Sequence, residues 1–309
     1  MRKVFVVTIA EQNGIEQTEL IEKDVILHQI LTDLSKNESF FDNFVFKGGT
    51  CLTKCHLGYY RFSEDIDFTW KNQEIFENIS QKQIRKNLSN IINTTGSIFE
   101  AIADKRGLDF KHDKQNRRYV ELGGSNKICT FKLWYTPCNF NVESFVKVQM
   151  NFVEKIHFTP QIGTLNALPC KKSEELSFLF SDYTEYFQTI NMYVYDTREI
   201  LCEKVRSVLT RKGVKARDFL DIYLLCKKYN LKLEDLLELI VDKICFTLDI
   251  YQKYREHFET KKIVVGLESF TWGKEEKLLL QKVEQEPFRE FLDDFQGFLK
   301  KVIEKIPSS

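Results

Sequence analysis

Two aspartates placed two residues apart are the feature of this sequence that points most directly to chemistry. Asp65 and Asp67 alternate with the apolar residues Ile66 and Phe68, which predicts a strand with one buried face. Alternate residues on a strand point the same way, so both carboxylates project from one face. Adjacent carboxylates repel each other, and a site that keeps both ionised typically holds a cation. Oxygen ligands of this kind suit Mg²⁺, with Mn²⁺ as the alternative.

A glycine-rich turn lies about 15 residues before the aspartates. The apolar run 44–46 ends in Lys47-Gly48-Gly49-Thr50, which predicts a strand, a tight turn and a helix through about residue 57. Glycines let the backbone approach a phosphate closely, and the start of a helix offers free N–H groups. Each motif alone is more often an ordinary turn or a solvated strand edge. Together they provide what nucleotide transfer requires, a phosphate-binding turn beside a metal-binding strand.

A second set of charged residues lies farther along the chain. Lys204 and Arg211 are at helical spacing, and Asp218 and Asp221 share a face of the next predicted helix. The two cations can hold a triphosphate, and one aspartate can accept a proton or orient Lys204. The alternative interpretation is a salt-bridged helix pair without chemistry.

The whole chain has 309 residues, 43% of them hydrophobic, and no net formal charge at pH 7. This length permits one large domain or two modest ones. The balanced charge excludes a global attraction to nucleic acid but not a local basic cleft. The chain starts with a predicted strand over residues 4–9, so we expect no signal peptide, no membrane span and a cytoplasmic location. We expect the eight cysteines to be reduced thiols, and Cys51 and Cys55 to pack in a helix rather than bind zinc.

The elements that must position these residues form a mixed α/β part followed by helices. The period of the apolar residues predicts helices over 16–36, 74–104, 196–212, 216–229, 233–245, 249–259 and 275–305, and strands over 107–112, 128–136, 142–153 and 191–195. Asp196 and Glu199 predict a capping box. The fold class is therefore α+β. We expect residues 1–155 to form an α/β core with a mixed sheet flanked by helices, and residues 156–309 a mostly helical C-terminal domain that contributes Lys204 and Asp218 to the cleft.

These motifs resemble, in their order, the motifs of the AbiEii/AbiGii toxin family of nucleotidyltransferases, part of the polymerase-beta-like superfamily. The runs 46–54 and 61–68 look like the first two motifs. Glu203-Lys204, Arg211 and the run 217–223 are similar to the later ones, a lysine on one helix and Arg-Asp-x-x-Asp on the next. The resemblance covers roughly residues 40–225 and implies a nucleotidyltransferase-type sheet.

The resemblance also implies roles for individual residues. Asp65, Asp67, Lys204 and Asp218 would be catalytic, and the first two would bind the metal. Ser63 is in addition a serine of the kind that is phosphorylated in some relatives. The residues expected to bind the nucleotide are Lys47, Gly48, Gly49, Thr50, Lys54, Arg61, Ser63, Arg211 and Asp221.

A third metal-binding carboxylate, common in the wider superfamily, has no clear counterpart. The predicted strand 142–153 offers Gln149 and Asn151 on its polar face, with Glu143 and Glu154 near its ends. Either two carboxylates suffice, or one of the glutamates helps, or the metal site is weak.

The activity implied by the resemblance is transfer of a nucleoside monophosphate from an NTP to an RNA hydroxyl, with the tRNA 3′ end as the expected acceptor and pyrophosphate as the product. It also implies a toxin of a type IV-like toxin–antitoxin system, of a kind linked to phage abortive infection, with a cognate antitoxin as partner. The alternatives are a protein or small-molecule acceptor, and a non-catalytic nucleotide- or RNA-binding protein of the same fold. One basic stretch fits either RNA contacts or a solvated loop: Lys111, Lys114, Arg117, Arg118 and Tyr119.

Overall fold

The computed structural model describes residues 2–139, 142–170, 173–262 and 271–307. The chain divides into two compact units, Met1–Glu154 with Pro160–Val194, and Lys155–Thr159 with Tyr195–Ser309. Residues 160–194 were expected in the helical part of the chain. They group with the first unit instead, because two strands within them extend its sheet.

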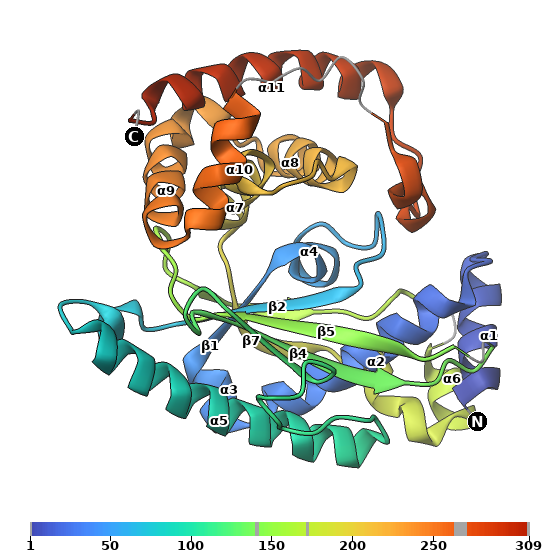
Figure 1. Ribbon diagram of the computed structural model, residues 1–309. Coiled ribbons are helices and arrows are strands. Elements are labelled where there is room, and N and C mark those ends of the chain that lie inside the picture. Colours follow the sequence, from blue (N-terminus) through green and yellow to red (C-terminus); the bar gives the residue numbers. More distant parts are fainter. Residues whose placement is uncertain (1, 140–141, 171–172, 263–270, 308–309) are drawn as a thin grey trace. The chain divides into compact units, whose positions relative to one another are not determined.

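The first unit is built on a mixed sheet, which has seven strands in the described part of the chain, in the order β3-β4-β5-β2-β1-β7-β6 (Figure 1). The pairs β2–β5 and β1–β7 are parallel, and the other neighbours are antiparallel. The strands are β1 (Phe44–Lys47), β2 (Asp65–Trp70), β3 (Val120–Gly123), β4 (Ile128–Tyr135), β5 (Ser144–Asn151), β6 (Gln161–Leu165) and β7 (Ile190–Val194).

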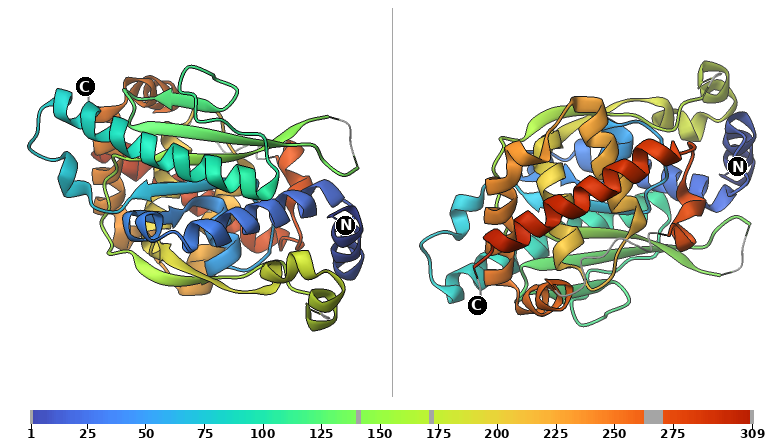
Figure 2. Two further views of the ribbon diagram at one scale, coloured as in Figure 1. Left: turned by 90° about the horizontal axis from the view of Figure 1, so that it is seen from below. Right: turned by 90° about the horizontal axis from the view of Figure 1, so that it is seen from above.

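One face of this sheet is covered by helices. Helices α2 and α5 run side by side along that face, as Figure 2 shows in the view from below. Aromatic contacts join α5 and the short helix that follows α2 to the strands: the rings of Phe99 in α5 and Phe131 in β4 lie 4.9 Å apart, and those of Phe40 in α3 and Phe68 in β2 lie 4.8 Å apart. The helical elements of the unit are α1 (Arg2–Asn13), α2 (Thr18–Ser35), α3 (Glu38–Asn43), α4 (Gly48–Cys51), the π-helical turn η1 (Leu52–His56), η2 (Gln73–Phe76), α5 (Gln81–Arg106), α6 (Ser173–Leu179) and η3 (Ser181–Phe187).

Two of the predicted strands are wrong. Residues 4–9 belong to α1, because their buried apolar side chains recur at helical spacing. Residues 107–112 form no regular strand, and Asp109 makes only an isolated bridge to Trp134. Strands β3 and β6 were missed, and the helix predicted over 74–104 is the short η2 followed by α5.

The second unit is helical in its described residues. Helix α11 lies across α8 and α9, as the view from above in Figure 2 shows, and Phe219 meets Phe295 in that contact with ring centroids 5.8 Å apart. The mixed sheet flanked by helices and the mostly helical C-terminal region confirm the predicted α+β class. The helical elements are α7 (Thr197–Thr210), α8 (Ala216–Tyr229), η4 (Leu233–Leu236), α9 (Leu237–Ile250), α10 (Gln252–Lys262), η5 (Gly273–Leu278) and α11 (Gln285–Lys305).

Only one of the two residues of the capping box predicted at α7 caps the helix. Asp196 caps the helix, since its side chain accepts a hydrogen bond from the backbone of the first turn. Glu199 is fully buried and has another task. Its carboxylate accepts a hydrogen bond from the backbone N–H of His157 at 2.7 Å and forms an ion pair with Lys243 at 2.5 Å. The segment 155–159 is thereby fastened to the helical unit.

Among the described residues, none of the helices combines the length and the apolarity that crossing a bilayer demands. None of the eight cysteines forms a disulfide.

Candidate active site

The paired aspartates project from the face of β2 opposite to the one that α2 and α5 cover. Asp65 and Asp67 are partly exposed, whereas the residues that alternate with them are buried against the helices. The neighbouring strand β5 sets Lys147 opposite Asp65 and Gln149 opposite Asp67. The Nζ of Lys147 lies 3.7 Å from Oδ2 of Asp65. The two carboxylates therefore share one face with a cation that the sequence did not indicate.

On the other side of β2, Lys47 of β1 lies in register with Asp67. Lys47 is 1% exposed, and its Nζ is 3.1 Å from Oε2 of Glu154. Glu143 forms an ion pair with Arg118 at 3.0 Å. Both glutamates considered as a third metal ligand thus form ion pairs with basic residues.

The glycine-rich turn packs against these residues at close range. Gly48 has φ +77°, and a Cβ atom there would lie 2.3 Å from Oδ2 of Asp67. A Cβ on Gly49 would lie 2.8 Å from Nη2 of Arg61 and 2.9 Å from Oγ of Ser63. Real Cβ atoms do not approach other atoms so closely, so a side chain at either position would displace its neighbour. The structure therefore brings together five of the predicted site residues.

Thr50 connects the turn to β2, because its hydroxyl donates a hydrogen bond to the backbone carbonyl of Asp65. Arg61 is buried, and its Nη1 donates to the carbonyl of Phe62 at 2.8 Å. Both side chains thus hold the backbone around the carboxylates in place.

Lys54 has a different environment from the one predicted for a nucleotide ligand. Its ammonium is fully buried and lies 2.8 Å from Oδ1 of Asp24 in α2. The hydroxyls of Tyr59 and Tyr186 donate to the same carboxylate at 3.0 and 2.9 Å. Burial lowers the pKa of Lys54, and the charge of Asp24 opposes this shift. The contact fixes the segment after the glycine turn to α2, and Asp24 had no local signal in the sequence.

The later motif residues form their own cluster within the second unit. Nζ of Lys204 lies 2.8 Å from Oδ1 of Asp218 and 2.6 Å from Oδ2 of Asp221. Arg211, just beyond the end of α7, reaches Oδ2 of Asp218 at 2.7 Å. The ion pairs expected between the charged residues of α7 and α8 are present. Both interpretations, a catalytic cluster and a salt-bridged helix pair, allow these ion pairs.

The charges of this cluster keep Asp218 ionised. Burial by itself raises the pKa of Asp218, but the charges of Lys204 and Arg211 outweigh it and hold that pKa below its ordinary value. Lys261 of α10 is a third cation here, which sequence reasoning missed. Burial and the nearby charge of Arg211 lower its pKa to about 8. An anion bound at this cluster would favour the protonated form of Lys261.

The donor set on β2 fits a hard divalent cation. Among the described residues, no group of three or more His, Cys, Asp or Glu side chains is arranged to hold a metal ion. Asp65 and Asp67 provide oxygen donors on one face, beside a backbone without side chains at Gly48 and Gly49. Mg²⁺ keeps several waters and is typically held by one or two carboxylates together with substrate phosphates. Two carboxylates beside an open turn match that requirement.

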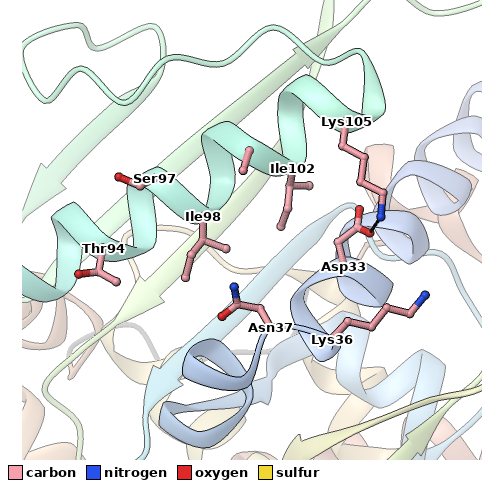
Figure 3. Close-up of a pocket in the computed structure, with 9 residues that line it drawn as sticks. Asp33, Lys36, Asn37, Thr94, Ser97, Ile98, Ile102 and Lys105 are labelled. Carbon is pink, nitrogen blue, oxygen red and sulfur yellow. Dashed lines mark hydrogen bonds and ion pairs between the residues drawn. The ribbon is translucent and has the colours of Figure 1, made fainter.

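A pocket of about 670 Å³ lies between α5 and the α2–α3 region, on the side of the sheet opposite the aspartates (Figure 3). Ile98 and Ile102 of α5 lie along it, and Lys105 pairs with Asp33 at 2.6 Å at one end. None of the predicted site residues lines this pocket.

Comparison with known families gives a match over most of the chain. The model of the family described as "Nucleotidyl transferase AbiEii toxin, Type IV TA system" matches residues 29–308. No curated protein matches. Among solved structures, JHP933 from Helicobacter pylori is 14% identical with a TM-score of 0.43, over 93% of this chain and 94% of that one. A candidate nucleotidyltransferase from H. pylori is 17% identical with a TM-score of 0.42, over 94% and 99%.

Proposed function

The chain belongs to the AbiEii nucleotidyl transferase toxin family, and on this premise we propose that it transfers a nucleoside monophosphate from an NTP to a hydroxyl of an RNA, with the tRNA 3′ end as the acceptor. The observation that carries this proposal is the close packing of Gly48 against Asp67. It unites a turn suited to phosphate with carboxylates suited to a metal.

Asp65 and Asp67 would hold Mg²⁺, or Mn²⁺ in its place. When bound, the metal would polarise the α-phosphoryl group and offset the charge of the leaving pyrophosphate. Gly48 and Gly49 would let the triphosphate approach the backbone N–H groups at the start of α4. Lys147, which lies beside Asp65, adds a positive charge on the same face.

Lys204 and Arg211 would bind phosphate groups of an NTP. Asp218 and Asp221 would then act by position, because they hold Lys204 from two sides. A carboxylate whose pKa is lowered is a weak proton acceptor at neutral pH. Asp218 is therefore better suited to orient Lys204 and Arg211 than to act as a general base.

In this reaction the acceptor hydroxyl oxygen forms a bond to the α-phosphorus. The bond from that phosphorus to the oxygen bridging the α- and β-phosphates breaks, and pyrophosphate leaves. The hydroxyl proton passes to water. Family membership also carries the expectation of a cognate antitoxin as a partner.

The test is label transfer from each of the four α-³²P-labelled NTPs to total tRNA in the presence of Mg²⁺. We expect label on intact tRNA and none on tRNA whose 3′-terminal diol has been oxidised with periodate. NTP binding without labelling of any RNA would overturn the RNA acceptor and favour a protein or small-molecule acceptor. Absence of NTP binding would favour the non-catalytic alternative.

A further inference from the structure

The basic stretch between residues 111 and 119 divides into two parts in the structure. Arg118 forms ion pairs with Asp109 at 2.9 Å and with Glu143 at 3.0 Å. Tyr119 is buried, and its hydroxyl donates to Asp109 at 2.8 Å. These two residues therefore serve the local structure, and the earlier part of the stretch has to be considered separately.

The earlier part of the stretch is seated on α5. The Nζ of Lys114 donates to both the carbonyl and the hydroxyl of Ser89 at 3.3 Å. The ring of His112 lies over Gly96, where a Cβ atom would be 2.2 Å from it. Ser89 and Gly96 are seven residues apart, so they lie on the same side of the helix two turns apart. The loop thus follows α5 and holds Lys114 in a defined place.

Further basic residues lie on the first turns of α5 and in the β3–β4 turn. Arg85 lies one turn before Ser89 on α5, and Lys127 of the β3–β4 turn lies close to it: burial, and then the charge of Arg85, lower the pKa of Lys127. Within the described parts of the chain, none of the basic residues in this group has a carboxylate within ion-pair distance. The group, named here the α5 basic surface, consists of Lys82, Arg85, Lys86, Lys114 and Lys127.

Two carboxylates beside His112, Asp113 in the loop and Glu100 in α5, form no ion pair with this surface among the described residues. Asp113 accepts a hydrogen bond from the backbone N–H of Gln115 at 2.9 Å, and Glu100 accepts one from the backbone N–H of His112 at 3.2 Å. In a chain with no net charge, five cations without ion pairs on one helix and its neighbouring loops form a local field that favours a polyanion.

We propose that the α5 basic surface binds the phosphate backbone of the RNA acceptor, an inference that rests on the proposed function. Its position supports this assignment. Lys127 lies three residues before Thr130, which stands in a cross-strand row with Gln149 and Asp67. Lys127 therefore lies about 10 Å along the strands and about 10 Å across them from Asp67, whereas α5 lies on the opposite face of the sheet. An RNA that passes the end of the sheet beside Lys127 can contact both the α5 basic surface and the face that carries the aspartates.

The experiment measures binding of tRNA to the full chain over a series of salt concentrations, without NTP. The variant combines Arg85→Glu and Lys127→Glu. We expect about tenfold or greater loss of affinity, and a slope of log K against log [salt] that is smaller by about one to two, since each phosphate contact contributes about 0.7–0.9. NTP binding should be unchanged. A second variant, Lys82→Glu with Lys86→Glu, changes exposed positions in the first turns of α5 and should shift affinity in the same direction.

The matched control combines Lys3→Glu with Lys300→Glu, two exposed lysines that lie outside this surface, and changes the net charge by the same amount. Three results would each overturn the inference. They are RNA affinity close to wild type in both α5 variants, an equal loss of RNA affinity in the control, and wild-type protein that binds no RNA. Failure of the proposed function would look different, because RNA would bind through this surface while no nucleotide was transferred.

Discussion

A Cβ atom on Gly48 would lie 2.3 Å from Oδ2 of Asp67. The backbone of the glycine turn and a carboxylate that we assign to the metal are therefore in direct contact, although one belongs to the start of a helix and the other to the adjacent strand. A side chain at position 48 must therefore displace Asp67 or move the turn away from it.

Replacement of Gly48 by alanine is expected to lower nucleotidyl transfer by about 100-fold, the effect of moving a reacting group by about 1 Å. Gly58→Ala is the matched control. Gly58 also has a positive φ, +82°, but a Cβ there meets nothing within 4 Å. Both variants should lose about 1–2 kcal/mol of unfolding free energy from the left-handed backbone, and only Gly48→Ala should lose activity in the folded protein. Equal nucleotidyl transfer by Gly48→Ala and Gly58→Ala would show that the contact between Gly48 and Asp67 is not important for the reaction.

Lys204 allows the catalytic and salt-bridge interpretations to be separated. Lys204→Met leaves the fully buried Asp221 without this cation, which should cost about 3–5 kcal/mol of unfolding free energy. Adding Asp221→Asn removes that buried charge and should recover most of the loss, since Asp218 keeps Arg211. We expect transfer activity to stay absent in the double variant. Recovery of activity together with stability would show that the pair is only structural.

The stability of the first unit should depend on pH through His28. Burial, and then the charge of Lys54, lower its pKa to about 3, whereas an unfolded histidine has a pKa near 6.5. Between these two pKa values, His28 therefore binds a proton in the unfolded chain but not in the folded chain. The contribution of neutral His28 to the free energy of unfolding is fully present above about pH 6.5. It is lost as the pH falls towards 3, by about 1.4 kcal/mol per pH unit.

His28→Gln removes this titration. Urea unfolding of both proteins between pH 4 and 6 should show wild-type stability falling relative to the variant by about that slope. A difference that stays constant with pH would contradict the account.

Gly96 is expected to resist a substitution that usually stabilises a helix. Alanine at Gly297 in α11 meets nothing within 4 Å and should add about 0.5–1 kcal/mol of unfolding free energy. Alanine at Gly96 would collide with the ring of His112 and should lower the midpoint of thermal unfolding. A gain in stability at Gly96 would show that the loop is not seated on α5 as described.

The parts of the site that the sequence predicted are those with a local signal. Asp65 and Asp67 alternate with buried residues, and Gly48 and Gly49 follow a short apolar run, so strand, turn and helix could be predicted within a few residues. The charge partners that are far apart in the sequence could not be predicted. Glu154 pairs with Lys47 from 107 residues away, and such a contact has no periodicity for a single sequence to reveal.

The same distinction explains the errors in the fold. The apolar residues of 4–9 fit both a short strand and one side of a helix, and the packing of Phe5 against Tyr183, with ring centroids 4.3 Å apart, favours the helix. Strands β3 and β6 each contain a glycine and are largely exposed or only partly buried, so their pairing with β4 and β7 defines them rather than their composition.

The most direct test of the account is nucleotidyl transfer by an Asp65→Asn, Asp67→Asn double variant, beside Glu64→Gln. Glu64 is the adjacent carboxylate and pairs with Lys23 at 3.2 Å. All proteins are incubated with α-³²P-labelled NTP, Mg²⁺ and tRNA, and their unfolding is measured in parallel. We predict that the double variant folds at least as stably as wild type, because two repelling charges are removed, and that its label transfer falls to background while Glu64→Gln remains active. Transfer at the wild-type rate by the double variant would contradict the assignment of this site.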